Sequence, residues 1–130
     1  MPKYHPIDVG VSFNCDHSDL LKVHWAVNSF SAVFLLPNHE ASGILVHFDG
    51  DTVVRILDEF VLSTEDDPAD RDGMVPYQFA YRLVGAPFFA IQSQVWKEVH
   101  RPLDHYQFVT GNGCVDVLSG SKPTFEIVRN

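Results

Sequence analysis

Seven histidines and two cysteines are the residues of this chain best suited to metal binding or acid–base chemistry. A zinc site needs three or four such ligands converging on the metal at about 2.0–2.3 Å. His24 and His47 lie in two segments expected to be strands, where they can face one another, and Cys15 and His17 are close in sequence. No helical metal motif such as HExxH is present, so the sequence predicts no metal and no other cofactor.

Nucleophilic catalysis needs a Ser, Thr or Cys beside a base and an orienting third group. All these residue types are present, but no local signature such as G-x-S-x-G occurs. Cys114 follows Gly113 in an expected tight turn, which favours partial exposure, although a buried structural thiol is the simpler interpretation. The sequence therefore predicts no catalytic residue. An enzyme or metalloprotein that uses His24, His47 or Cys114 remains the third functional hypothesis.

Negative charge is concentrated in one polar stretch. Seven of the 17 acidic residues lie there: Asp58, Glu59, Glu65, Asp66, Asp67, Asp70 and Asp72. The stretch contains a proline and lacks the EF-hand spacing, so it predicts an exposed loop rather than a calcium site. The net charge of −8 disfavours nucleic acids and anionic membranes as partners. The first functional hypothesis is a non-enzymatic interaction protein whose acidic docking surface attracts a basic protein partner.

Aromatic residues are abundant, with ten Phe, four Tyr and two Trp. Most occupy the apolar faces of expected strands, where a packed core is their default role. A closed or half-closed sheet lined by such rings can also hold a small apolar ligand. The second functional hypothesis is therefore a small-ligand-binding, β-barrel-like protein. Its candidate polar site residues are His24, His47, His105 and Tyr106.

The apolar pattern has a period of two in several segments, which predicts strands with one face in the core. The alternating segments are 7–13, 21–27 and 77–83, and the continuous apolar runs 32–36 and 43–48 are typical of central strands. Strands with one wetter face suit an antiparallel sheet better than a parallel one.

Two dipeptides predict tight turns between strands. Asn-Gly at 112–113 is a strong hairpin signal, because both residues tolerate positive φ. A two-residue loop there would place Phe108 opposite Val117, on the face away from Val109 and Asp116. Asp-Gly at 49–50 predicts a second hairpin, in which the strand before it pairs with the strand after it.

Two further segments have helical character. Asp51–Phe60 fits a strand or a helix, and its β-branched cluster favours the strand. Pro87–His100 is the best helix candidate, with a proline suited to the first turn. Its apolar stripe consists of Phe88, Ile91, Val95 and Val99.

The C-terminal part of the chain has a distinctive pattern, HYQFVTGN followed after one residue by CVDVLS, over positions 105–119. This pattern resembles the closing hairpin of a group of small uncharacterised bacterial proteins. The resemblance implies a bacterial cytoplasmic protein, and it assigns no activity and no site residue. His105 and Tyr106 suggest a polar feature at the start of this hairpin, most simply a hydrogen-bonded structural pair.

These observations predict one domain over residues 1–130, of the β-rich α+β class. We expect an antiparallel sandwich or barrel-like sheet of about eight or nine strands, with one helix near 87–100. No apolar run approaches the roughly 18 residues of a membrane span, and the N-terminus lacks a signal-peptide core, which favours the cytoplasm. Cys15 and Cys114 are then expected to be thiols rather than a disulfide. An exposed sheet edge would provide a route to a homodimer.

Overall fold

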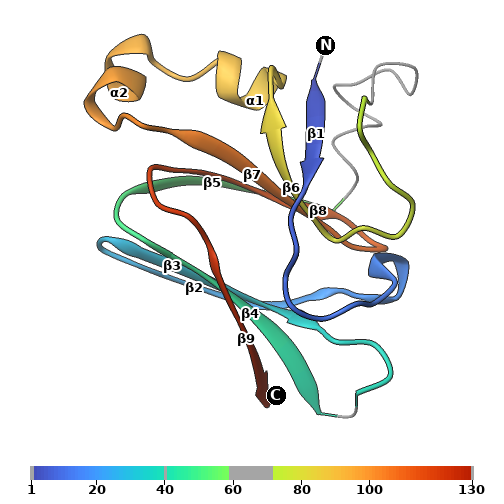
Figure 1. Cartoon of the computed structure of the whole chain (residues 1–130). Coiled ribbons are helices and arrows are strands. Elements are labelled where there is room, and N and C mark those ends of the chain that lie inside the picture. The colour runs from blue at the N-terminus through green and yellow to red at the C-terminus, as the bar shows by residue number, and fades with distance from the viewer. Residues whose placement is uncertain (1, 40, 59–71, 130) are drawn as a thin grey trace.

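The computed structural model describes residues 2–39, 41–58 and 72–129. In this part of the chain nine strands form two antiparallel sheets that stack as a sandwich (Figure 1). The predicted β-rich fold class is therefore confirmed. The strands are β1 (Lys3–Pro6), β2 (Leu20–Ala26), β3 (Ser29–Leu35), β4 (Ser42–Asp49), β5 (Thr52–Leu57), β6 (Ala80–Val84), β7 (Asp104–Val109), β8 (Cys114–Ser119) and β9 (Thr124–Arg129).

Sheet A has the strand order β1-β6-β7-β8-β5, and sheet B has the order β2-β3-β4-β9. Three short helices complete the described structure: the 3-10 helix η1 (Cys15–His17), α1 (Pro87–Ala90) and α2 (Gln94–Val99). Figure 1 shows α1 and α2 on the side of sheet A that faces away from sheet B. Sheet A is therefore covered on both faces in this region, whereas no described element covers the outer face of sheet B.

The core between the sheets is a cluster of phenylalanine rings. Phe108 of β7 lies at its centre, with ring centroids 6.0 Å from Phe34, 6.1 Å from Phe48 and 5.5 Å from Phe79. In sheet B, β3 covers positions 32–35 of the run predicted at 32–36, and β4 covers the run predicted at 43–48. Both strands point alternate side chains into this cluster. Strand alternation thus explains why one sheet face is almost wholly apolar.

The strand predicted at 7–13 is wrong, because this segment is a loop outside the sheets. Gly10 has φ of +88°, and the Asp8 side chain accepts the Gly10 N–H, which turns the chain locally. The apolar side chains Val9, Val11 and Phe13 still pack against the core. The alternation therefore predicted correctly that these side chains are buried on one side. It predicted the wrong secondary structure, because the segment is a loop and not a strand.

The strand predicted at 77–83 begins three residues late. Tyr77 adopts φ of +67° in a turn and is 60% exposed, and β6 starts at Ala80. A positive φ is costly for a bulky residue and is incompatible with an extended strand. The segment before Ala80 therefore turns the chain into sheet A instead of extending it.

The hairpin predicted at 112–113 exists, but with a longer loop. Val109 pairs with Cys114 and Phe108 pairs with Val115, so the predicted pairing of Phe108 with Val117 is wrong. The Thr110 N–H and hydroxyl both donate to the Gly113 carbonyl and close the wider turn. The predicted faces are nevertheless correct, because a shift of two residues keeps each side chain on its side.

The hairpin predicted at 49–50 is wrong in a different way. The strands on either side of this turn belong to different sheets: β4 pairs with β3 and β9, whereas β5 pairs with β8. The turn therefore connects the two layers. The strand interpretation of Asp51–Phe60 is confirmed over Thr52–Leu57.

The single helix predicted near 87–100 is divided into α1 and α2. Ser93 caps α2, and its hydroxyl accepts the Trp96 N–H. Phe88 is buried, but the other three residues of the predicted stripe are exposed by more than 70%: Ile91, Val95 and Val99. The break changes the direction of the chain, so the stripe does not continue into the core.

Candidate functional site

The acidic docking surface predicted at 58–72 falls mostly outside the described residues. Five of its seven acidic residues lie outside the described part of the chain: Glu59, Glu65, Asp66, Asp67 and Asp70. Asp58 is exposed at the end of β5. Asp72 forms a parallel bridge with Lys3, and its carbonyl accepts the Tyr4 N–H at 2.7 Å. Asp58 and Asp72, the two predicted docking residues that the structure describes, thus lie beside sheet A.

His105 and Tyr106 point to opposite faces of β7, so the predicted hydrogen-bonded pair is wrong. Tyr106 packs against Phe48 in the core, with ring centroids 5.4 Å apart, and burial raises the pKa of its phenol. His105 lies on the outer face of sheet A beneath α1, and its ring packs edge-on against Phe88 at 5.6 Å. Adjacent strand residues cannot share a face.

A buried polar cluster surrounds Asp116, a residue of β8 with no exposed surface. Its Oδ2 accepts hydrogen bonds from Arg55 Nε at 3.3 Å and Nη2 at 3.0 Å. Its Oδ1 accepts the Gln107 amide at 3.0 Å and lies 2.7 Å from His105 Nε2. The Arg55 guanidinium also lies 4.3 Å from the centre of the Phe88 ring, a cation–π contact. Arg55, His105, Gln107 and Asp116 are named below as the Asp116 cluster.

The Asp116 cluster links α1 to the middle of sheet A. Nδ1 of His105 and Oε1 of Gln107 form no hydrogen bond within the described residues. His105, Gln107 and Asp116 are almost completely buried, and Arg55, whose side chain is 23% exposed, is the member of the cluster that reaches the surface. Sequence reasoning identified only His105 of these four residues. A further signal was present, because Asp116 interrupts the apolar run from Cys114 to Leu118.

A second polar constellation lies on the outer face of sheet B. His24, Ser31, His47 and Thr124 form one row across the four strands. His47 Nδ1 lies 2.7 Å from the Ser31 hydroxyl, and its Nε2 lies 2.9 Å from Asp49. His24 and His47 therefore lie on the same face of the sheet, but Ser31 lies between them, so they do not face one another directly.

The chain of Ser31, His47 and Asp49 resembles the hydrogen-bond order of a serine hydrolase triad. Acyl transfer also needs donors aimed at a developing oxyanion. Ser31 and His47 lie in the interior strands of sheet B, where backbone groups are engaged in the ladders of β3 and β4. Asp49 is 84% exposed, so water screens its effect on His47. Ser31 therefore has an imidazole beside it, but the carboxylate that contacts this imidazole is exposed to solvent.

No group of three or more His, Cys, Asp or Glu side chains in residues 2–39, 41–58 and 72–129 is arranged to hold a metal ion. Cys15 and Cys114 are both buried and are not joined in a disulfide. Burial, reinforced by the neighbouring Asp16 carboxylate, raises the pKa of the Cys15 thiol to about 11. Cys15 therefore remains protonated near neutral pH, which suits a structural thiol rather than a nucleophile.

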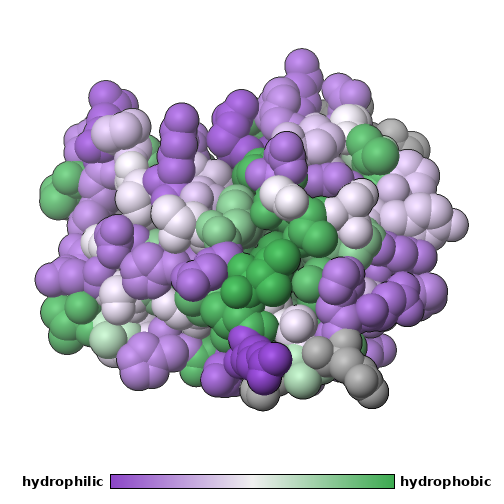
Figure 2. Space-filling view, turned by 60° about the horizontal axis from the view of Figure 1, so that its bottom comes forward, coloured by the Kyte–Doolittle hydropathy of each residue, from purple (hydrophilic) through white to green (hydrophobic). Residues whose placement is uncertain are grey.

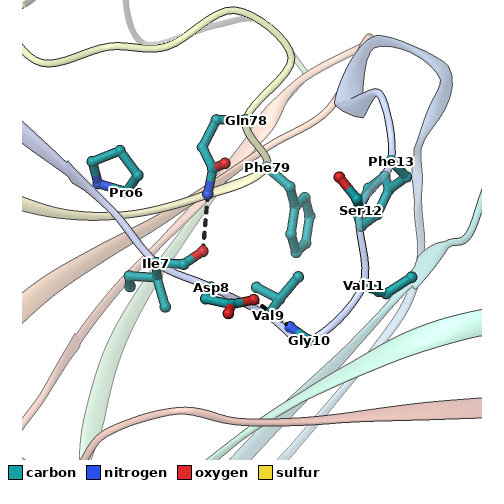
Figure 3. A pocket seen from close by; sticks show the side chains of 10 residues that line it. All are labelled: Pro6, Ile7, Asp8, Val9, Gly10, Val11, Ser12, Phe13, Gln78 and Phe79. Carbon is teal, nitrogen blue, oxygen red and sulfur yellow. Dashed lines mark hydrogen bonds between the residues drawn. The ribbon is translucent and has the colours of Figure 1, made fainter.

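A pocket of about 560 Å³ opens beside the loop that joins β1 to η1 (Figure 3). Val9, Val11 and Phe79 are among its apolar lining residues. The Gln78 amide donates to the carbonyls of Ile7 and Ala80 and fixes the loop against β6. The volume of this pocket is in the range of small-molecule sites, and the pocket is lined by both apolar side chains and backbone groups.

Exposed apolar side chains are the remaining feature. Figure 2 shows a hydrophobic band on the sheet B side of the molecule, bordered by hydrophilic groups. The outward apolar positions of that sheet are Val33, Leu35, Leu45 and Val128, and they are buried or half-buried. The apolar residues of the edge strand β2 are more exposed: 45% for Leu21, 42% for Val23 and 66% for Trp25.

Comparisons with protein families, with curated proteins and with solved structures give no match. Among the described residues, no helix is both long enough and apolar enough to cross a membrane. The described residues present a buried ionic cluster, an open pocket and an exposed apolar edge on a molecule of net charge −8.

Proposed function

We propose that this protein is a non-enzymatic interaction protein that binds a basic protein partner. The proposal rests on one observation: Leu21, Val23 and Trp25 are 42–66% exposed on a sheet edge of a molecule with net charge −8. Exposed apolar residues that are contiguous, unlike scattered ones, are typical of interaction sites. The negative charge would attract a basic partner over longer range and oppose association with other acidic proteins.

The two polar groups described above, the Asp116 cluster and the row that contains Ser31 and His47, are compatible with this proposal. The Asp116 carboxylate is completely buried, and Ser31 and His47 lie in interior strands whose backbone groups are engaged in the ladders of sheet B. A binding role uses the exposed surface without requiring either of them.

The test is affinity capture followed by a measurement on a purified partner. We expect a captured partner to be basic, to bind with a defined stoichiometry in calorimetry, and to bind more weakly at 0.5 M than at 0.1 M salt. Replacing the seven acidic residues of 58–72 by Asn or Gln should weaken binding by about tenfold, since exposed charge pairs contribute about 0.2–1 kcal/mol each. A purified partner whose affinity does not depend on salt would contradict the proposal.

The pocket beside the β1–η1 loop favours a second candidate function, the binding of a small apolar ligand. Native mass spectrometry of the purified protein should then show a bound molecule of constant mass. Val11→Trp would fill part of the pocket and should abolish that added mass, while Val99→Trp on exposed α2 should not. A bare polypeptide mass in every preparation would exclude this candidate.

A further inference from the structure

In the described part of the chain, the two sheets leave one side of the sandwich open, where the edge strand β2 of sheet B lies near the edge strand β5 of sheet A. A small pocket of about 120 Å³ is lined by residues of both strands, among them Leu20 and Ile56. We name this side the β2/β5 flank and define it by Leu20, Val23, Trp25, Val54 and Ile56. We propose that the β2/β5 flank binds an extended segment of a protein partner, with alternating apolar residues between Lys- or Arg-bearing ends. This inference rests on the proposed function and specifies its partner.

The apolar side chains of the flank belong to the core-facing sides of both strands. Val23 pairs with Ala32 and Trp25 pairs with Phe30, and both of these β3 residues are 2% exposed in the core. Ile56 pairs with Val115, which is 1% exposed. Although they face the core side, Val23, Trp25 and Ile56 remain 42–66% exposed. The hydrophobic core thus continues outward to the flank without a covering element among the described residues.

The backbone of β2 provides the second part of the site. β2 ends sheet B, so its outer edge has no neighbouring strand in the described part of the chain. Proteins commonly protect such edges with bulges, charged side chains or coverage. β2 has a bulge between Leu20 and Lys22, but the remainder through Ala26 pairs regularly with β3. An added strand could therefore take both backbone hydrogen bonds and side-chain contacts from β2.

Carboxylates lie at both ends of the flank. Asp19 and Asp58 line the small pocket at one end. At the other end, Asp49 and Asp51 flank Gly50, whose N–H donates to the Asn28 carbonyl in the β2–β3 turn at 2.8 Å. The core-facing positions between these ends are apolar or Thr. A segment with a cation at each end and apolar residues between them matches this distribution of charge.

The basic side chains near the flank either point away from it or contact the carboxylates at its Asp49 end. Lys22 and His24 alternate with Val23 on β2 and lie on the outer face of sheet B, and Arg55 lies in the Asp116 cluster. His47 contacts Asp49, and His100 contacts Asp51. Hydrogen bonds to the Trp96 carbonyl and to Asp51 raise the pKa of His100. Acidification would therefore charge His100 and weaken the attraction of Asp51 for a cationic segment.

A second copy of this chain fits the flank less well than a basic partner. Antiparallel pairing of two β2 strands would bring the Asp19 end of each copy toward the Asp49 end of the other. Four carboxylates would then approach at each junction, and like charges at an interface oppose association. A homodimer through this edge is therefore one of the outcomes that the experiment must distinguish.

The experiment uses the full-length protein and the fluorescein-labelled peptide KKVTVTVKK as the probe, followed by fluorescence anisotropy. We expect the wild-type protein to bind this peptide, and to bind it more tightly at low salt. We expect it not to bind the control peptides EEVTVTVEE and KKGSGSGKK. Val23→Lys and Trp25→Ala should each weaken binding at least tenfold. The matched control Val99→Lys adds the same charge at an exposed valine of α2 and should bind like wild type. Asp19→Asn and Asp58→Asn should each weaken binding by about threefold, as surface charge pairs do.

The outcomes separate this site from the proposed function. Peptide binding that survives Val23→Lys and Trp25→Ala would overturn the β2/β5 flank but leave an acidic interaction protein in place. Absence of peptide binding, together with a purified basic partner whose affinity ignores Val23→Lys, would do the same. A dimer in light scattering that becomes a monomer with Trp25→Ala would assign the flank to a second copy and overturn the basic partner. Circular dichroism of each variant establishes that it is folded.

Discussion

Asp116→Ala should lower the free energy of unfolding by about 3–5 kcal/mol, the usual cost of removing one partner of a buried ionic group. Asp116 is completely buried and accepts hydrogen bonds from Arg55 and Gln107, with His105 Nε2 2.7 Å away. Alanine leaves these groups without their common acceptor in a site that water does not reach. Urea unfolding followed by circular dichroism, compared at equal m-values, measures the loss.

Two further variants define the cause of that loss. Asp49→Ala removes a carboxylate that is 84% exposed and bound to His47, so it should cost less than about 1 kcal/mol. Arg55→Met combined with Asp116→Ala should cost less than the sum of the single changes, because the two residues interact directly. Additive effects, or a loss with Asp116→Ala no greater than with Asp49→Ala, would show that the Asp116 cluster does not stabilise the fold.

Phe108→Ala should lower the free energy of unfolding by about 3–5 kcal/mol, because a large cavity would open in a closely packed core. Phe108 is 1% exposed, and its ring contacts four others, those of Phe34, Phe48, Phe79 and Phe125. Three of these rings belong to sheet B and Phe79 lies just before β6, whereas Phe108 itself belongs to sheet A. Removing Phe108 therefore weakens the packing between the two layers rather than within one of them.

Trp25→Ala is the matched aromatic control for Phe108→Ala. Trp25 is 66% exposed at the β2 edge, so its removal should change the free energy of unfolding by less than about 1 kcal/mol. Thermal and urea unfolding of both variants would test this contrast. A loss with Trp25→Ala as large as with Phe108→Ala would mean that the β2/β5 flank is structural, and that its exposure does not indicate a binding surface.

The central strands and the faces of the closing hairpin follow from local pattern. Continuous apolar runs identified the central strands β3 and β4. Alternation of apolar and polar side chains identified β2 and the opposite faces of Phe108 and Val109 in the closing hairpin. It failed for residues 7–13, since a loop packed on one side produces the same alternation. Pairing partners were less predictable, because the turn at Asn112 closes with a wider loop than its dipeptide suggests.

The candidate site was much less accessible to sequence reasoning. Arg55 and Asp116 are 61 positions apart and meet only because β5 pairs with β8. That pairing required the turn after Asp49 to cross between sheets, whereas an Asp-Gly turn usually suggests a hairpin. The exposure of Ile91, Val95 and Val99 depended in the same way on the break between α1 and α2.

The edge strand β2 shows where the two kinds of information divide. The sequence by itself determined that residues 21–27 form a strand with one apolar face and that the molecule is acidic, since side-chain alternation and charge are local properties. Only the tertiary structure decided that this strand ends sheet B, so that Val23 and Trp25 lie beyond the cover of sheet A. Strand order depends on contacts between segments that are distant in the sequence. Because β2 lies at the edge of sheet B, its core-facing side chains form an exposed apolar flank with carboxylates at both ends.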